Sequence, residues 1–319
     1  MDRLEQLQRW LDSLASNTYS NLQPASSDAS FRQYFRVTDR QLGKSFIVMD
    51  APPEKENCKP FIHVTELLRN AGVNAPAILA VDLKQGFLLL DDLGNRPYLN
   101  ELNDDTADAL YIDAIDAIIK MQKIDAILPL YNAQLLQAEM DLFEQWYVKR
   151  HLEMTLNDTQ QTVLQNAFSL LIKSAEEQPQ VFVHRDYHSR NLMITQENNP
   201  GVIDYQDAVI GPISYDLVSL FKDCYIRWPR EKVELWLELY LARITPAQLI
   251  DRQTLLRWFD LMGVQRHLKV LGIFARLNYR DGKAQYLDDL PLTLQYTLEA
   301  CAAYPELQPL KQLLDELHS

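Results

Sequence analysis

Three polar side chains past the middle of the chain could together hold a metal ion and activate a hydroxyl group. Asp186 and Asn191 lie in the polar stretch His184–Asn191, between two apolar segments, and Asp204 directly follows the apolar pair Val202-Ile203. Carboxylate and amide oxygens are ligands that suit Mg²⁺. If two of these side chains hold the metal, one carboxylate is left to orient a hydroxyl group. This combination suits a site where a phosphoryl group is transferred from a magnesium-bound nucleotide.

The elements expected to position these side chains differ between the two ends of the chain. Residues 1–92 hold short alternating apolar runs, which predict a small sheet with strands at 31–37 and 45–50 and a hairpin at 78–90. Residues 93–319 repeat apolar positions at helical spacing, interrupted by the motif region. Helices are expected at about 3–14, 60–70, 104–123, 135–152, 158–176, 213–223, 230–243, 251–279 and 288–303. The pattern predicts an α+β protein with an N-terminal lobe, 1–92, and a larger, mostly helical lobe, 93–319.

The composition restricts the classes of partner. The chain of 319 residues is 24% charged and 47% hydrophobic, which is typical of a folded enzyme. Its net charge of −13 argues against nucleic acid or an anionic membrane as a partner. Cys58, Cys224 and Cys301 are too few and too widely spaced for a disulfide framework or a zinc site. With neither an apolar leader nor an apolar run of membrane-spanning length, a cytoplasmic protein is expected.

The motif and its surroundings resemble a known family. His184-x-Asp186-x-x-x-x-Asn191 is followed by Val-Ile-Asp204-Tyr-Gln and then by Gly211-Pro-Ile-Ser-Tyr-Asp216. This order is similar to that of the kinase-like phosphotransferases, in the aminoglycoside phosphotransferase branch. Within that branch, stretches such as Phe87-Leu-Leu-Leu-Asp-Asp-Leu-Gly94 resemble the bacterial anomeric sugar kinases that act on N-acetylmuramate and N-acetylglucosamine. The resemblance implies a bilobal protein-kinase-like fold.

The resemblance also assigns the three polar residues their roles. Asp186 would accept or orient the substrate hydroxyl, and Asn191 and Asp204 would hold Mg²⁺ that bridges the phosphates of ATP. These roles agree with the chemistry, because a loose phosphoryl-transfer transition state needs positioning and charge neutralisation more than covalent catalysis. An alternative in which Asp186 and Asn191 merely cap a loop leaves the order of the three ligand types unexplained.

Supporting roles follow from the same resemblance. The adenine ring would lie against the backbone of Asp92 and Leu93 at the hinge between the lobes, and the sequence does not distinguish ATP from GTP. His184 would hold the loop by hydrogen bonds and would not act as a base. Asp216 would accept backbone N–H groups of the loop or, equally, serve only as a negative charge at a helix N-terminus.

Two departures from the protein-kinase pattern concern the nucleotide phosphates. No glycine-rich loop precedes the first strands, and Ser26–Ser30 occupies its place, so that backbone N–H groups near Ser27 could bind phosphate instead. Met49 stands where the lysine of Val-Ala-Ile-Lys would end a strand. Arg32, ahead of Arg36, is the candidate to replace that cation, although both could equally be exposed strand arginines.

A run of basic residues stands out in this acidic chain. Arg266, Lys269, Arg276 and Arg280 fall on one face of the helix expected at 251–279. One interpretation is a solvated basic face. The other is that Arg276 or Arg280 borders the acceptor pocket and binds a substrate carboxylate, for which arginine is well suited.

These features together predict an ATP- and Mg²⁺-dependent kinase that phosphorylates a sugar hydroxyl. Only a short segment separates Asp204 from Gly211, which leaves no room for an activation loop, so a small-molecule sugar is expected as substrate and a protein is not. One alternative is an aminoglycoside, choline or homoserine kinase on the same scaffold. Another is a nucleotide-binding pseudokinase, motivated by Met49. The sequence does not fix the oligomeric state.

Overall fold

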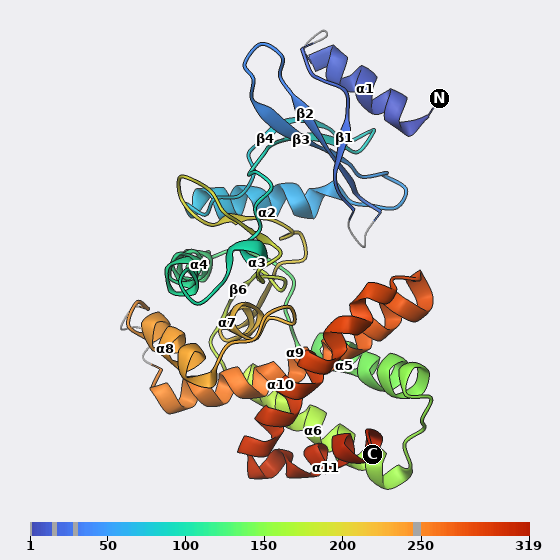
Figure 1. Cartoon of the computed structure of the whole chain (residues 1–319), viewed down its shortest axis with the longest axis vertical. Helices are drawn as coiled ribbons and strands as arrows, with labels where there is room; N and C mark the ends of the chain where they lie inside the picture. Colours follow the sequence, from blue (N-terminus) through green and yellow to red (C-terminus); the bar gives the residue numbers. More distant parts are fainter. Residues whose placement is uncertain (1, 15–17, 28–30, 245–249) are drawn as a thin grey trace. The chain divides into compact units, whose positions relative to one another are not determined.

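The chain forms two compact units, which Figure 1 shows in a computed structural model that describes residues 2–14, 18–27, 31–244 and 250–319. The first unit comprises residues 1–98 and 191–207, and the second comprises 99–190 and 208–319. The side chains of residues 26 and 27 are outside the described part. No helix among the described residues is both long enough and apolar enough to span a bilayer.

The first unit is built on a five-stranded antiparallel sheet in the order β1-β2-β3-β5-β4. Its strands are β1 (Gln23–Ser27), β2 (Gln33–Thr38), β3 (Ser45–Asp50), β4 (Ile78–Asp82) and β5 (Phe87–Asp91), and its helices are α1 (Arg3–Leu14) and α2 (Cys58–Asn70). Phe35 and Val37 of β2 are buried in one core cluster with Leu7 and Leu11 of α1. The alternation of β2 therefore places its apolar face against α1 and Arg36 on the other side.

The hairpin β7–β8 belongs to the first unit although it lies far along the chain. β7 (Leu192–Met193) pairs with β8 (Gly201–Val202), and isolated bridges join Pro97 to Met193 and Asn74 to Gly201. This division by contacts differs from the predicted lobes 1–92 and 93–319, because these bridges tie the segment with the expected metal ligands to the N-terminal part. The functional division into a nucleotide lobe and a catalytic lobe stays a prediction.

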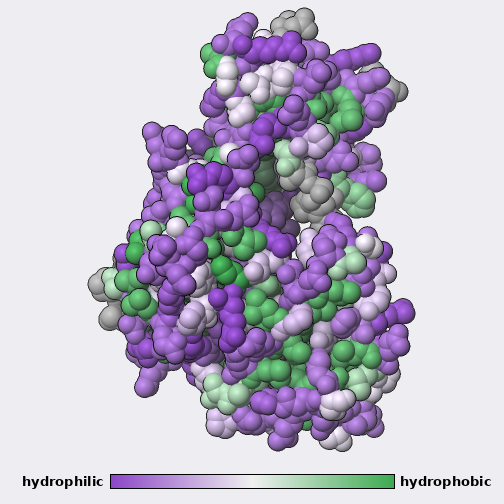
Figure 2. All heavy atoms as spheres, in the orientation of Figure 1, coloured by the Kyte–Doolittle hydropathy of each residue, from purple (hydrophilic) through white to green (hydrophobic). Residues whose placement is uncertain are grey.

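The second unit is mostly helical and carries one short two-stranded sheet. Strands β6 (Gln180–Val183) and β9 (Val209–Pro212) pair antiparallel. Its helices are α3 (Tyr98–Glu101, which begins at the border of the units), α4 (Ala107–Met121), α5 (Ala133–Leu142), η1 (Phe143–His151), α6 (Asp158–Glu176), α7 (Tyr215–Phe221), α8 (Arg230–Leu241), α9 (Arg252–Asp281), η3 (Ala284–Asp289), α10 (Leu290–Ala303), η4 (Pro305–Leu307) and α11 (Gln308–Leu317). The face drawn in Figure 2 is mostly hydrophilic, and its apolar side chains gather over these helices in the lower half of the view.

Helix α9 is the central element of the second unit. Its 30 residues are capped by the Asp251 side chain, which accepts the Thr254 N–H, and end at Gly282 in the left-handed conformation. Its middle part is buried on all sides, because α5, η1, α6, α7 and α10 pack around it. Such a helix can place charged side chains in the interior only where partners meet them.

The segment predicted as one helix at 135–152 changes geometry midway. It is α-helical through Leu142 and continues as the π-helix η1 from Phe143. At this point Gly272 of α9 lies against the backbone of Leu142: a Cβ added to Gly272 would lie 2.5 Å from the Leu142 carbonyl oxygen and closer still to its carbon. Glycine therefore permits the close crossing of the two helices.

We predict that Gly272→Ala destabilises the protein by about 3 kcal/mol, because the added methyl group forces the two helix backbones apart. Gly263→Ala on the same helix is the matched control, since its Cβ would meet side chains at 3.9 Å, an ordinary contact. Urea unfolding of both variants measures the difference. A Gly272→Ala midpoint equal to that of Gly263→Ala would contradict the close crossing.

Candidate active site

The loop after β6 is held by a buried carboxylate. Asp216, in the first turn of α7, accepts the backbone N–H of His184 at 2.7 Å and that of Arg185 at 3.1 Å. Burial raises the pKa of Asp216 to about 7, while the two N–H groups favour its ionised form. Arg185 adopts a φ of 77°, a strained conformation for a large side chain, directly before Asp186. Of the two interpretations of Asp216, the geometry is that of a loop anchor.

Asp186 lies among positively charged groups of its own unit. Its backbone N–H donates to Nδ1 of the fully buried His184 at 3.2 Å. Burial raises the pKa of Asp186, but Lys269 and Arg266 on α9 outweigh that effect and hold the pKa below its ordinary value. The carboxylate is therefore ionised at neutral pH and able to orient a hydroxyl group.

Glu139 of α5 neutralises the cations around this loop. Its carboxylate pairs with Arg185, accepts the Tyr131 hydroxyl, and lies 3.1 Å from the Lys269 ammonium. Lys269 also donates to the Tyr215 hydroxyl at 3.0 Å. Burial raises the pKa of Glu139, and the charges of Lys269 and Arg185 more than offset it, so the pKa falls below its ordinary value. A carboxylate 7% exposed thus supports the residues next to Asp186.

The predicted basic face of α9 is divided along its length. Arg266 and Lys269 are 4% and 6% exposed, so the interpretation as a solvated face is wrong for them. They are buried because Tyr215, Glu139 and Asp186 supply partners. Arg280 is exposed and donates to the neighbouring Asp281 through two bonds of 2.8 Å.

Arg276 lies on α9 between the buried residues Arg266 and Lys269 and the exposed Arg280, and its own exposure is intermediate. Its side chain is partly buried, and no acceptor for its buried Nε is present among the described residues. Burial, and then the charge of Arg280, lower its pKa. Because it follows Lys269 by two helical turns, it lies about 10 Å along α9 from the cations beside Asp186. The structure thus leaves Arg276 able to receive an anionic group.

The two expected metal ligands meet in the first unit. The Asn191 amide donates to the Asp204 carboxylate at 3.2 Å, and the Ile203 N–H donates to the Asn191 carbonyl at 3.1 Å. Asp204 has a φ of 65°, in the left-handed region that Asp tolerates better than most residues. The next residue, Tyr205, is buried against α2, where its hydroxyl lies 2.8 Å from that of Thr65.

These donors suit Mg²⁺. The carboxylate and the amide, once rotated to present its oxygen, give two hard ligands on adjacent segments, and Mg²⁺ takes its remaining ligands from water and phosphates. No group of three His, Cys, Asp or Glu side chains gathers as a metal site in the described ranges. The pair therefore fits an ion completed by a nucleotide better than a structural metal held by the protein alone.

The arginines considered for the nucleotide phosphates are engaged in ion pairs within the first unit. Arg36 pairs with Asp92 at 2.6 Å and donates to the Gly94 carbonyl at 3.0 Å. Arg32 is 7% exposed and pairs with Glu56 at 3.1 Å, so neither arginine is a simple exposed strand residue. Met49 is fully buried in β3.

The remaining nucleotide-binding candidates are placed as follows. Leu93 is partly exposed. Its side chain packs close to Gly201, since a Cβ added to Gly201 would lie 2.9 Å from Leu93 Cδ1. The backbone of Ser27 pairs with Gln33 in the sheet, but its side chain lies outside the described part. Residues 28–30, which were expected to help bind phosphate, lie outside it as well.

Residues 21–254 match the phosphotransferase enzyme family. The chain belongs to this family. A protein of Pseudomonas putida named N-acetylmuramate/N-acetylglucosamine kinase is 48% identical, over 99% of this chain and 97% of that protein. A Pseudomonas aeruginosa protein of the same name is 47% identical over the same shares. Among solved structures, an ethanolamine kinase of Plasmodium vivax superposes with a TM-score of 0.69 over 90% of this chain and 85% of its own, at 12% identity, which shows the shared fold.

For this phosphotransferase, the sequence did not reveal the role of Glu139. One signal was available: a glutamate between Leu136 and Met140, on the buried face of a predicted helix, needs a buried partner. The spacing could not name that partner, because Arg185 and Lys269 come from a distant loop and a distant helix.

We predict that Glu139→Gln in this phosphotransferase costs about 3–5 kcal/mol of stability, because it leaves the buried Lys269 and Arg185 without a counter-charge. We also expect kcat to fall at least tenfold, since both cations lie beside the loop of Asp186. Denaturant unfolding and steady-state kinetics measure the two effects.

The double variant Glu139→Gln/Lys269→Met provides the control. Removing Lys269, one of the two cations left without a counter-charge, should recover part of the lost stability but not the lost activity. A single variant as stable as the wild type would show that Glu139 does not balance these charges.

Proposed function

We propose that this phosphotransferase transfers the γ-phosphate of ATP to the anomeric hydroxyl of an amino sugar, N-acetylmuramate or N-acetylglucosamine. The observation that carries the proposal is the cationic surrounding of Asp186, formed by Lys269 and Arg266. Relatives that are 47% and 48% identical over nearly the whole chain, and that bear the name of kinases for these two sugars, supply the substrate class.

The charge around Asp186 argues against cationic acceptors. Aminoglycosides and choline are positively charged, so their kinases would need acidic side chains near the reacting hydroxyl. Within its own unit, Lys269 and Arg266 instead affect Asp186 most strongly, and the carboxylate of Asp216 nearby is engaged with backbone N–H groups. A neutral or anionic sugar meets no such repulsion, and homoserine, with its ammonium group, is disfavoured as well.

Each of the candidate residues has a separate role in the proposed reaction. Asp186 orients the sugar hydroxyl and takes its proton as the oxygen attacks the γ-phosphorus, while the bond from that phosphorus to the bridging oxygen of ADP breaks. Asn191 and Asp204 would hold Mg²⁺, which when bound neutralises charge on the phosphates. Asp216 and His184 keep the loop in place.

The cation that replaces the phosphate lysine of protein kinases belongs to this proposal too. Arg32 is our candidate, because it is nearly buried and its ion pair with Glu56 could be exchanged for a phosphate. The backbone of Ser27, Asp92 and Leu93 would complete the nucleotide site. The pseudokinase alternative is disfavoured because Asp186, Asn191 and Asp204 are all present.

The donor and the acceptor together suggest a place in metabolism. A reaction that uses ATP is expected in the cytoplasm, and amino sugars of this kind are units of the bacterial cell wall. We therefore propose that the enzyme recovers cell-wall sugars.

We predict that purified protein releases ADP from ATP only with Mg²⁺ and an N-acetylated amino sugar. A panel of N-acetylmuramate, N-acetylglucosamine, choline, homoserine and an aminoglycoside, read by coupled ADP release, measures the preference. Asp186→Ala should lower kcat at least a thousandfold, because the hydroxyl loses its orienting carboxylate. Turnover with choline but not with the sugars would refute the proposal.

We predict that Arg276→Ala raises KM for N-acetylmuramate about tenfold or more while leaving KM for N-acetylglucosamine within twofold. The lactyl carboxylate of the former can bind the free guanidinium, and a charge-assisted hydrogen bond contributes about 1.5–3 kcal/mol. Arg280→Ala is the matched control, since Arg280 is exposed and already paired with Asp281. Equal KM changes for both sugars would exclude carboxylate recognition by Arg276.

A further inference from the structure

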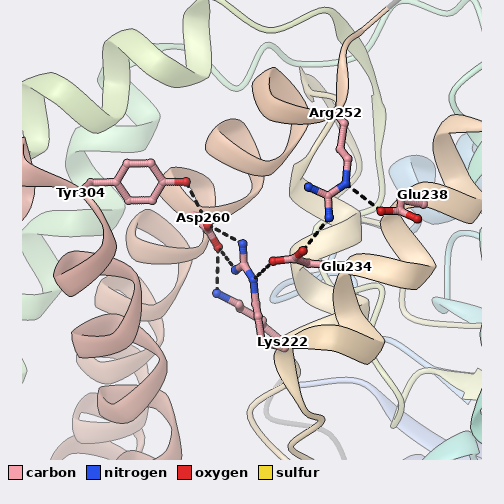
Figure 3. A network of polar contacts seen from close by, with 7 residues as sticks. Lys222, Glu234, Glu238, Arg252, Asp260 and Tyr304 are labelled. Atoms are coloured by element: carbon pink, nitrogen blue, oxygen red, sulfur yellow. Dashed lines mark hydrogen bonds and ion pairs between the residues drawn. The ribbon is translucent and has the colours of Figure 1, made fainter.

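A polar cavity lies in the helical unit, and its lining does not include the residues around Asp186. It has a volume of about 310 Å³ and lies among the end of α7, the start of α8, α9 and α10. The residues that matter for its chemistry are Lys222, Arg227, Trp228, Arg230, Asp260 and Tyr296. Figure 3 shows the network beside it, in which Lys222 and Tyr304 converge on Asp260. Its lining shares no residue with the candidate active site.

The charges of this lining do not cancel. Asp260 accepts from Lys222 at 3.1 Å, from Arg230 at 2.5 and 2.9 Å, and from the Tyr304 hydroxyl at 3.0 Å. Its carboxylate is shared by Lys222 and Arg230, and Arg230 also pairs with Glu234 at 2.7 Å, outside the lining. Arg227 pairs separately with Glu299 at 2.7 Å. Within the lining itself, the three cations Lys222, Arg227 and Arg230 exceed the two carboxylates Asp260 and Glu299 by one, and Glu234 compensates Arg230 from outside it.

Lys222 has hydrogen-bonding capacity that the described residues do not use. Its side chain is 7% exposed, and its ammonium group carries three N–H bonds, of which Asp260 accepts one. Burial lowers the pKa of Lys222, and Asp260 opposes that effect without cancelling it. A buried ammonium beside a cavity is stabilised when an anion enters and accepts its remaining hydrogens.

The backbone and the rings of the cavity favour a phosphorylated molecule. Helix α8 begins at Arg230 after Pro229, which offers no side-chain cap, so the positive end of the helix dipole lies at the lining. Trp228 and Tyr296 provide apolar surface, and Trp228 is fixed by its Nε1 donating to the Tyr111 hydroxyl at 2.8 Å. Phosphate suits the cations, and a sugar-sized body suits the rings and the volume.

We propose that this cavity binds a small phosphate monoester, with its phosphate group beside Lys222 and Arg227 and its body against Trp228 and Tyr296. The proposal does not depend on the identity of the acceptor sugar. Asp223, the residue after Lys222, accepts the Ser189 N–H at 2.9 Å in the loop that carries Asp186. A bound anion would therefore lie next to Asp223, which holds the loop that carries Asp186.

Isothermal titration calorimetry with glucose 1-phosphate tests the proposal, with inorganic phosphate and glucose as further probes. MgADP is kept saturating so that the nucleotide site is filled. We expect glucose 1-phosphate and inorganic phosphate to bind the wild type at one saturable site. Glucose should not bind. Lys222→Met should weaken binding at least tenfold, and Arg227→Gln, which alters a half-exposed side chain, should weaken it several-fold.

A matched pair on α10 separates this cavity from the active site even if Lys222→Met fails to fold. Ala303 lines the cavity and Ala302 is exposed outside it. Ala303→Leu should abolish binding, while Ala302→Leu should leave the affinity within twofold. Unchanged affinity in Ala303→Leu would place the anion elsewhere and overturn the proposal. Binding of glucose as strong as that of its phosphate, or no saturable binding by the wild type, would overturn it as well.

Discussion

The arrangement around Asp186 depends on one constraint, which is that charges buried in the helical unit must balance. Lys269 and Arg185 converge on Glu139, and Lys269 and Arg266 in turn lower the pKa of Asp186. In an interior of low dielectric, removing any one of these charges leaves another without compensation. Because they come from α5, the loop after β6 and α9, the balance fixes the relative positions of those elements.

The same constraint separates the local charge around Asp186 from the net charge of the protein. The net charge of −13 belongs to the whole chain, whereas Arg185, Arg266 and Lys269 lie near Asp186 in its own unit. Glu139 and Asp216 oppose these cations, and charges in a buried region are screened little by salt. The charge that a substrate would meet beside Asp186 is therefore set by these few residues and not by the net charge of the chain.

Backbone strain stands beside the residues proposed to do chemistry. Arg185 and Asp204 both have positive φ, one next to Asp186 and the other itself a proposed ligand of Mg²⁺. Such conformations persist only where neighbours enforce them, and they are enriched at functional sites. In the first loop, Asp216 enforces it through two backbone bonds. In the second, the buried Tyr205 anchors the chain to α2.

The sequence by itself determined the elements and the motif. Alternation placed β2 and β3, helical spacing placed α6 and α9 to within a few residues, and the order of Asp186, Asn191 and Asp204 led to the phosphotransferase family. These features are encoded between near neighbours in the chain. Only the tertiary structure decided that Arg266 and Lys269 are buried, that Glu139 balances them, that the helix after Leu142 turns to π geometry, and that the segment with Asn191 and Asp204 joins the first unit. Each of these depends on a partner distant in sequence, and spacing along the chain shows which face of an element a residue occupies but not what that face will meet.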